Sequence, residues 1–372
     1  MKVAIFHNAL DNIGGAELVD LIMARELDAD IYTTNIDQEK IKKLGFTTNN
    51  IYSIGKVPIN APFRQEAIYW RFRFLDVEKI FKKKYDCYII AGDWAMAGAI
   101  HNKPHFWYVY SPTRELYDLY PYLRKKVIAP WQRPLFDCWV IYRRIINQHD
   151  IKKVKKIIAI SNNVSQRIKK YLKRKSKVIY PPIETKDYYT KNSQGYWLSV
   201  NRLFKHKRVH LQIEAFQKMP DKKLIIVGSY EASRHFKEYA AYIKKIKPKN
   251  VEIKSWINKK ELLKLYAECI GLLATAKDED YGLSPLEAMA AGKPVIAADE
   301  GGYKETITKN TGIVIKEINQ EKIVKAVKEI EEKLNQDPTQ FIKSAREQAK
   351  KFDTKIFIEK IKEEIEQCKN QN

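Results

Sequence analysis

The sequence predicts an α/β protein with two doubly wound parallel sheets. Short apolar runs, typical of buried parallel strands, alternate with segments of helical periodicity along the chain. The alternation breaks once, at Tyr180-Pro-Pro-Ile183, because consecutive prolines continue neither a strand nor a helix. At 372 residues the chain is long enough for two ordinary domains. We therefore expect one domain over residues 1–183 and a second over residues 184–353.

In the first domain a Gly14-Gly15 pair follows the first strand and precedes the first helix, Ala16–Glu26. A later helix is expected over Val164–Leu172. The strands are expected at Val3–Phe6, Ile31–Thr33, Tyr88–Ala91, Trp107–Tyr110, Ile157–Ile160 and Val178–Tyr180.

The second domain repeats this pattern. Its strands are expected at Tyr196–Val200, Lys223–Val227, Val251–Lys254, Gly271–Ala274, Pro294–Ala297 and Gly312–Ile315. Its helices are expected at Val209–Lys218, Lys260–Cys269, Leu286–Ala291 and Gln320–Leu334, and a last helix at Thr354–Cys368.

The charge of the chain is strongly positive, at a formal +23. Met1–Ile183 holds 32 basic against 17 acidic residues, so most of the excess, +15, lies in the first half. Such a field attracts anions: nucleotide sugars, phospholipid head groups, polyprenyl phosphates or nucleic acid. A lysine-rich solvated surface is the alternative that composition leaves open.

The cysteines and the N-terminus indicate a cytoplasmic protein. Cys87, Cys138, Cys269 and Cys368 lie far apart without metal-binding spacing, so we expect buried free thiols in a reducing compartment. Met1–Phe6 is too short for a signal peptide, and no uncharged apolar run is long enough for a transmembrane helix.

Two glutamates, Glu279 and Glu287, stand eight residues apart around a Gly-Leu-Ser-Pro turn. Glycine and proline place the first on a loop, and the helix formers that follow predict a helix starting near Ser284 or Pro285. A helix start offers free N–H groups and a partial positive charge. The site suits a polyhydroxyl ligand that carries phosphate, such as a sugar nucleotide. The alternative is a buried Ala-rich helix with two surface glutamates.

This segment resembles the E-x7-E region of retaining glycosyltransferases of family 4. The resemblance implies that Glu279 contacts the hydroxyls of the donor sugar and Glu287 the ribose. The backbone of Gly282, Leu283 and Ser284 would meet the diphosphate.

The family has the GT-B fold, in which two Rossmann-like domains face each other across a cleft. The resemblance implies an N-terminal acceptor-binding domain and a C-terminal nucleotide-sugar-binding domain. It also implies that the C-terminal helix, within residues 354–372, packs back on the first domain.

A basic loop, Asn201–Arg208, follows the first strand of the second domain, where open α/β sheets bind ligands. Arg202 and Lys207 can aim two cations at one diphosphate. The loop resembles the family pattern G-R-L-x-x-x-K, with Asn201 in place of the glycine. The resemblance implies that both cations bind the diphosphate and stabilise the leaving charge, so Glu279, Arg202 and Lys207 are the catalytic candidates. A solvated basic loop is the alternative.

Two glycine pairs also resemble family motifs. Gly14-Gly15-Ala-Glu17 resembles the N-terminal G-G-A-E loop, where glycines let the backbone approach a phosphate or sugar. It is not the G-x-G-x-x-G fingerprint, which disfavours a nicotinamide dehydrogenase. Gly301-Gly302-Tyr-Lys-Glu305 matches the G-G-x-x-E turn, so Glu305 is a donor-site candidate or an ordinary capping residue.

Tyr110-Ser-Pro-Thr-Arg114, followed by Asp118, resembles the H-[ST]-P-x-R-x-x-x-D stretch of a mannosyltransferase-like branch of family 4. Tyr110 stands where that branch has a histidine near the donor sugar. Tyr110, Arg114 and Asp118 are therefore candidates for the acceptor or sugar side.

The segment His105–Arg144 is rich in aromatic and basic residues. This composition suits a membrane interface, stacking on sugars or single-stranded nucleic acid, or a half-buried aromatic core. Asp278-Glu-Asp280 has the D-x-D pattern of a metal site, but it comes late in the chain. Because Arg202 and Lys207 supply positive charge, we expect no metal and no other cofactor.

Together these features predict a retaining, metal-independent glycosyltransferase. It takes a hexose, by preference mannose from GDP-mannose and otherwise a UDP-linked sugar, to a glycan or polyprenyl-linked acceptor. We expect an anionic membrane surface on the cytoplasmic side as a partner, and no nucleic acid. A phosphorylase or epimerase of the same fold is one alternative. A basic nucleic-acid-binding protein is another, but it leaves Glu279 and Glu287 unexplained because carboxylates repel phosphate.

Overall fold

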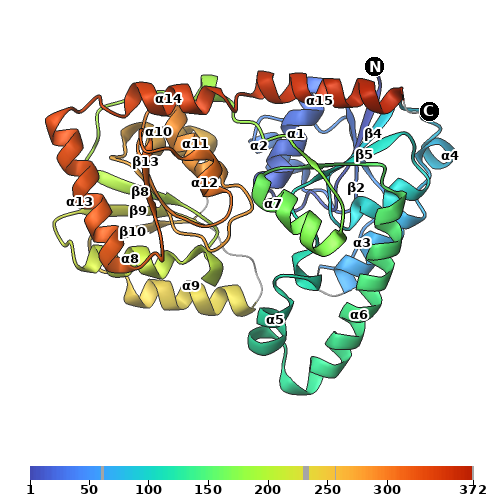
Figure 1. The fold of residues 1–372 in the computed structure, drawn as a ribbon, viewed down its shortest axis with the longest axis horizontal. Helices are drawn as coiled ribbons and strands as arrows, with labels where there is room; N and C mark the ends of the chain where they lie inside the picture. The colour runs from blue at the N-terminus through green and yellow to red at the C-terminus, as the bar shows by residue number, and fades with distance from the viewer. Residues whose placement is uncertain (60–62, 229–233, 256, 371–372) are drawn as a thin grey trace. The chain divides into compact units, whose positions relative to one another are not determined.

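The computed structural model describes residues 1–59, 63–228, 234–255 and 257–370. They form two compact units, each around one parallel sheet (Figure 1). Unit 1 comprises Met1–Pro181 and the segment from Phe357 onward, and unit 2 comprises Pro182–Ile356. The expected α/β class with two parallel sheets is confirmed.

Unit 1 has a seven-stranded parallel sheet in the order β3-β2-β1-β4-β5-β6-β7. Six strands match the expected ones within two residues, and β3 was not expected because it is short, only half-buried and at the sheet edge. The strands are β1 (Val3–Phe6), β2 (Asp30–Thr33), β3 (Ile51–Ser53), β4 (Cys87–Ile90), β5 (His105–Val109), β6 (Lys156–Ala159) and β7 (Lys177–Val178).

The helices of unit 1 flank this sheet, and α7 continues into a wider π-helical turn at Ile168–Leu172. They are α1 (Gly15–Leu27), α2 (Gln38–Lys43), α3 (Phe63–Arg73), α4 (Val77–Phe81), α5 (Tyr120–Tyr122), α6 (Arg133–Asp150), α7 (Asn162–Arg167) and α15 (Thr354–Lys369).

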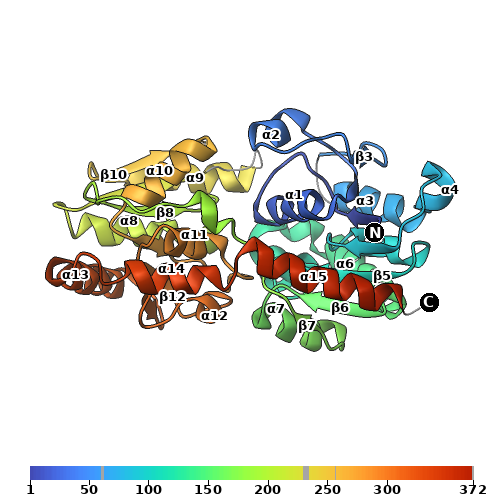
Figure 2. The same cartoon turned by 90° about the horizontal axis from the view of Figure 1, so that it is seen from above.

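Helix α15 lies along unit 1 (Figure 2). Its Glu364 is fully buried and pairs with two lysines, Lys156 of β6 and Lys177 of β7, the latter at 2.6 Å. The Phe357 ring packs 5.8 Å from that of Tyr108 in β5. Charge pairing and apolar contact therefore fasten this helix to the edge of the sheet.

Unit 2 has a six-stranded parallel sheet in the order β10-β9-β8-β11-β12-β13, and all six strands were expected. They are β8 (Tyr196–Val200), β9 (Lys223–Val227), β10 (Val251–Lys254), β11 (Leu272–Ala274), β12 (Val295–Ala298) and β13 (Gly312–Ile315). The helices are α8 (Val209–Gln217), α9 (Arg234–Ile246), α10 (Lys259–Glu268), α11 (Leu283–Ala290), α12 (Tyr303–Thr306), α13 (Gln320–Gln336) and α14 (Ile342–Lys350). The strand order reverses between β8 and β11, where open α/β sheets hold ligands at the carboxyl ends of the strands.

Two expectations need correction. Helix α11 begins at Leu283, one residue before the expected start near Ser284, and its N-cap is Gly282 at φ 93° instead of a serine. Cys138 is exposed, whereas Cys87, Cys269 and Cys368 are buried free thiols as expected. Its apolar neighbours on α6 point outward, so an apolar sequence context did not signal burial there. Among the described helices, none is long and apolar enough to cross a bilayer.

Candidate active site

The candidate donor site lies in unit 2, on the loops after β8, β11 and β12. Lys207 Nζ contacts Glu279 Oε2 at 2.6 Å, and both side chains are mostly buried. The Phe204 ring lies near both cations of this site: its centroid is 5.7 Å from Lys207 Nζ and 5.8 Å from the Arg202 guanidinium carbon. The structure thus brings together Arg202, Lys207 and Glu279, the three catalytic candidates.

The loops after β8 and β11 are joined by hydrogen bonds. The Thr275 hydroxyl donates to the carbonyl of Lys207 at 2.8 Å, and the N–H of Lys277 donates to the carbonyl of His206 at 2.7 Å. Asn201, which replaces the family glycine, is not in the left-handed region, and its amide donates to Ser199 Oγ at 2.7 Å. The backbone there does not require glycine, so the substitution leaves the loop intact.

Gly301 and Gly302 hold the loop that carries Glu279. The N–H of Gly302 donates to the carbonyl of Glu279 at 2.8 Å. A Cβ on Gly301, at φ 62°, would lie 2.2 Å from that same carbonyl oxygen, and one on Gly302 would lie 2.5 Å from the Cα of Tyr281. Only glycines permit this approach, and Glu305 follows on α12 as a half-buried residue.

A bidentate ion pair to the loop that follows β12 also stabilises this region. Arg208 Nη1 and Nη2 contact Glu300 Oε1 and Oε2 at 2.7 and 3.1 Å. Arg208 takes φ 51°, which ends the basic loop and starts α8. Fork-to-fork pairing adds geometric rigidity to charge attraction, so it fixes the loop next to Lys207.

Glu287 lies in the second turn of α11. The Tyr266 hydroxyl donates to Glu287 Oε2. Burial raises the pKa of Glu287, while hydrogen bonds from Tyr266 and Tyr188 partly offset that rise. Burial and the Glu287 charge raise the pKa of both tyrosines well above the ordinary value, so both hydroxyls remain donors.

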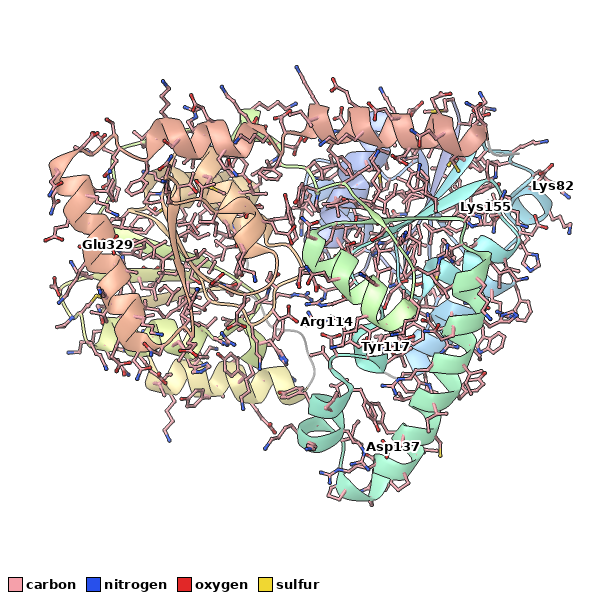
Figure 3. The ribbon with its side chains drawn as sticks, in the orientation of Figure 1. Lys82, Arg114, Tyr117, Asp137, Lys155 and Glu329 are labelled. Atoms are coloured by element: carbon pink, nitrogen blue, oxygen red, sulfur yellow. The ribbon has the colours of Figure 1, made fainter. Side chains whose placement is uncertain are left out.

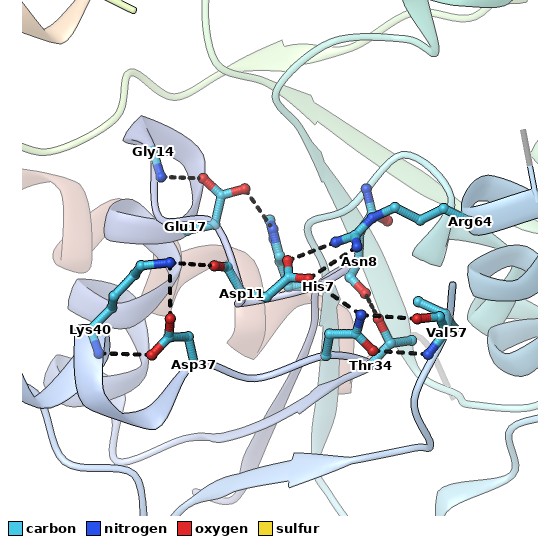
Figure 4. Close-up of polar contacts among 11 residues, drawn as sticks. His7, Asn8, Asp11, Gly14, Glu17, Thr34, Asp37, Lys40, Val57 and Arg64 are labelled. Carbon is cyan, nitrogen blue, oxygen red and sulfur yellow. Dashed lines mark hydrogen bonds and ion pairs between the residues drawn. The ribbon is translucent and has the colours of Figure 1, made fainter. Parts of the chain in front are cut away.

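Unit 1 holds a second polar cluster, at the carboxyl ends of β1 and β5. The N–H of Gly14, the N-cap of α1, donates to Glu17 Oε2 at 2.8 Å, and Glu17 Oε1 lies 3.2 Å from His7 Nε2 (Figure 4). His7 Nδ1 pairs with Asp20 Oδ2 at 2.5 Å. The Tyr110 hydroxyl donates to Asp20 Oδ1 at 2.5 Å. The tyrosine that replaces the family histidine is therefore a hydrogen-bond donor to a buried carboxylate.

The ionisation of this cluster follows from burial and pairing. Burial by itself lowers the pKa of His7, but the Asp20 and Glu17 carboxylates outweigh burial and raise it to about 10. Burial raises the pKa of Asp20, and the charge of His7 opposes that shift without cancelling it. Burial also pushes the pKa of Glu17 up, but its bonds to His7 and the Gly14 N–H bring it below the ordinary value. A charged imidazolium thus sits between two carboxyl groups.

The remaining candidates of unit 1 follow β5. Arg114 Nε and Nη2 both contact Asp118 Oδ2, at 2.9 and 2.7 Å, and Figure 3 labels Arg114. Nearby, Arg167 Nη1 donates to Ser111 Oγ at 3.2 Å. Burial and the charge of Asp93 raise the pKa of Glu115 to about 7, so a carboxyl that titrates near neutrality lies in this loop.

The sequence patterns did not indicate several of these residues. Phe204, the Arg208–Glu300 pair, Tyr188 and Tyr266 complete the donor cluster, and His7 and Asp20 complete the cluster in unit 1. Phe204 lies on the basic loop itself, but most of the other contacts join residues that are far apart in the chain, so no local spacing signals them. Only the position of His7 directly after a buried strand was a usable signal. Among the residues that the structure describes, no group of three or more His, Cys, Asp or Glu side chains has the arrangement of a metal site.

The two parallel-sheet units have the GT-B architecture, a fold that this chain shares with solved glycosyltransferases. Residues 183–348 match the family described as "Glycosyl transferases group 1". Anabaena HepE, solved in complex with UDP-glucose, superposes with a TM-score of 0.74 at 18% identity, covering 99% of this chain and 100% of that one.

Two curated relatives are mannosyltransferases by name. The O-antigen chain mannosyltransferase RfbU of Salmonella typhimurium is 25% identical over 256 residues, which cover 62% of this chain and 72% of RfbU. The alpha-1,3/1,6-mannosyltransferase ALG2 of Kluyveromyces lactis is 28% identical over 375 residues, covering 82% of this chain and 71% of ALG2.

Proposed function

We propose that the protein is a retaining glycosyltransferase that moves a hexose from a nucleotide diphosphate sugar to a hydroxyl of a glycan or polyprenyl-linked acceptor. The observation that carries this proposal is the Lys207–Glu279 pair beside the N-terminus of α11. A cation, a carboxylate and free helix N–H groups there provide complementary partners for a diphosphate and for sugar hydroxyls.

In the proposed chemistry, different groups stabilise the charge of the diphosphate and orient the donor sugar. Arg202, Lys207 and the N–H groups from Gly282 to Ser284 bind the diphosphate, and Glu279 orients the donor sugar. The bond from the anomeric carbon to the diphosphate breaks while a bond to the acceptor oxygen forms on the same face. The acceptor proton passes to the departing phosphate oxygen. The protein then contributes by positioning the reactants and by electrostatic stabilisation.

Glu287 is assigned to the ribose in this proposal. Its carboxylate is fixed by Tyr266 and Tyr188, which orient it without supplying a positive charge. A fixed carboxylate that accepts hydrogen bonds from hydroxyls suits a diol. Because Arg202 and Lys207 can stabilise the leaving diphosphate, the proposed mechanism needs no metal.

Mannose from GDP-mannose is the preferred donor. RfbU and ALG2 are named as mannosyltransferases, and the segment from Tyr110 to Asp118 resembles the mannosyltransferase-like branch. UDP-linked sugars are the second choice, because HepE was solved with UDP-glucose.

The test is a panel of sugar nucleotides, each assayed for thermal stabilisation and then for transfer. A ligand at a hundredfold excess over its Kd adds about 2.7 kcal/mol, which shifts the Tm of a unit of this size by about 5–10 °C. GDP-mannose should give the largest shift, and EDTA should leave transfer unchanged. No shift with any sugar nucleotide contradicts the proposal. Release of sugar 1-phosphate on adding inorganic phosphate identifies a phosphorylase instead.

A further inference from the structure

Helix α6 buries three polar or charged residues and exposes several large apolar ones. The buried positions are Val140, Arg143, Asn147 and Asp150, spaced three and four residues apart along one face. Three of these four residues are polar or charged. Surface helices of globular proteins have the opposite arrangement. This reversal is the feature of unit 1 that the proposed transferase chemistry leaves unexplained.

The inward polar residues are all engaged by neighbouring elements. The Arg143 guanidinium lies 3.8 Å from the Tyr69 ring centroid and 4.8 Å from that of Trp94. Asp150 accepts from the Tyr69 hydroxyl at 2.5 Å, and Asn147 accepts from the Tyr117 hydroxyl at 2.8 Å. These contacts fix the rotation of α6 about its axis, so the apolar face is held outward by specific bonds.

The outward face carries large apolar side chains and no charge over three turns. Leu135 is 75% exposed, Ile141 57%, Tyr142 46% and Ile145 66%, and Cys138 lies among them, also exposed. We call these five residues the outer face of α6. These residues form a continuous apolar stripe along the helix, and the exposure of such a stripe to water is unfavourable.

The N-terminal end of α6 extends this face with an aromatic and basic tip. Figure 1 shows α5 and the start of α6 projecting from the sheet of unit 1. Trp131, just before α6, is 79% exposed, and Lys125 and Lys126 are exposed beside it in the chain. Residues 119–149 contain six Lys or Arg and one acidic residue, Asp137, which is bound to Arg124 at 2.9 Å and to Tyr120 at 2.7 Å.

We propose that the outer face of α6, with Trp131, Lys125 and Lys126 at its tip, docks on an anionic lipid surface. An apolar stripe with an interfacial tryptophan and flanking lysines is the chemistry that lies in the headgroup boundary of a bilayer. Charge complementarity selects lipid over a second copy, because residues 1–183 carry a net +15 and two copies would repel each other. The inference extends the proposed function by placing the enzyme where a polyprenyl-linked acceptor is held.

The first experiment measures binding to vesicles without any sugar nucleotide, so its outcome is independent of transferase activity. Because Cys87, Cys269 and Cys368 are buried, a polarity-sensitive thiol dye reports from Cys138 within the outer face. Vesicles with equal phosphatidylcholine and phosphatidylglycerol should shift the dye emission to the blue, and phosphatidylcholine alone should do so far less. Binding should weaken as salt rises from about 0.1 to 1 M, which shortens the screening length from about 10 to 3 Å.

Variants then separate the apolar face from the charge. Trp131→Ser and Leu135→Ser should each weaken binding at least about tenfold, measured by vesicle sedimentation of unlabelled protein. Lys125→Gln with Lys126→Gln should weaken binding to anionic vesicles about 30-fold, since each cation contributes about fivefold. The matched control is Lys152→Gln with Lys153→Gln, two exposed lysines just after the other end of α6, which should change binding less than about threefold.

Two results would overturn the docking proposal. One is vesicle binding that is the same for the tip and control variants, or absent at low salt. The other is a wild-type dimer that Leu135→Ser converts to a monomer in sedimentation velocity, which assigns the face to a second copy. Tm values within a few degrees of wild type establish that each variant is folded.

Discussion

Replacing Gly301 by alanine tests whether the loop that carries Glu279 depends on a backbone approach that only glycine permits. In the structure Gly301 takes φ 62°, and its Cα faces the backbone of Glu279. The added Cβ would lie 2.2 Å from the Glu279 carbonyl oxygen and 2.5 Å from its nitrogen. Backbone atoms cannot rotate out of the way as a flexible side chain can, so the loop itself must move.

The size of the effect follows from these distances. Ordinary contact starts at 3.4 Å, so the two backbone segments must separate by 1.2 Å. The left-handed φ costs an alanine about 1–2 kcal/mol, and the overpacking adds about 1–3 kcal/mol. A displacement near 1 Å at a catalytic group can cost about a hundredfold in rate. We therefore expect Gly301→Ala to lower kcat/KM about a hundredfold and the Tm of unit 2 by several degrees.

Gly195→Ala is the matched control. Gly195 also lies in unit 2 and takes φ 75°, but a Cβ there has nothing within 4 Å. Alanine at position 195 has the same left-handed backbone strain but no steric clash. The assay compares the two variants for Tm and for kcat/KM with the donor identified by the panel. If Gly301→Ala stays within about threefold of Gly195→Ala in kcat/KM, the close approach does not position Glu279 and the reasoning fails.

Three further perturbations test other contacts. Lys207→Ala should lower kcat more than it raises KM, because the Lys207 charge acts on the leaving diphosphate. Lys205→Ala, on the same loop, should change neither constant. Equal losses of kcat in the two variants would refute the role of Lys207. Glu287→Gln should cost donor binding and turnover about 1–3 kcal/mol together, and near-wild-type kinetics would exclude a ribose contact. His7→Gln should cost about 3–5 kcal/mol of unfolding free energy at neutral pH, since it leaves buried carboxyl groups unpaired.

The pH dependence of stability gives an independent test at His7. Its pKa is raised from 6.5 to about 10 in the folded state, so its stabilising contribution is complete below about pH 6.5 and declines as pH rises toward 10. Wild-type unfolding free energy, measured from pH 6 to 10, should fall over that window, and that of His7→Gln should fall less. Parallel curves for the two proteins would contradict a charged His7.

The sheets were predictable from the sequence because buried parallel strands are continuous apolar runs. In unit 2 every strand was recognised, since each is a short apolar run that is mostly buried. β3 was missed because an edge strand that is only half-buried has little apolar signal. The start of α11 was misplaced because the turn geometry belongs to Gly282 and its neighbour Tyr303, a contact that no local pattern records.

The candidate site was predictable only where motifs are local. Glu279, Arg202 and Lys207 were named from spacing, and the structure brings them together. The groups that hold the surrounding residues were not named, because Tyr266 contacts Glu287 and Glu300 contacts Arg208 across long stretches of the chain. On α6 the sequence showed an aromatic and basic segment, but only the structure shows which side chains face solvent.

The attachment of α15 sets the order in which the molecule can be completed during synthesis. Its buried residues, from Phe357 to Cys368, cover part of unit 1, yet they follow all of unit 2 in the chain. While the ribosome is still making unit 2, the apolar surface that receives Phe357 and the lysines that pair with Glu364 remain uncovered. Unit 1 is therefore synthesised first but completes its packing last. A chain truncated before Phe357 would lack a helix that unit 1 needs, although unit 1 is the first part to be made.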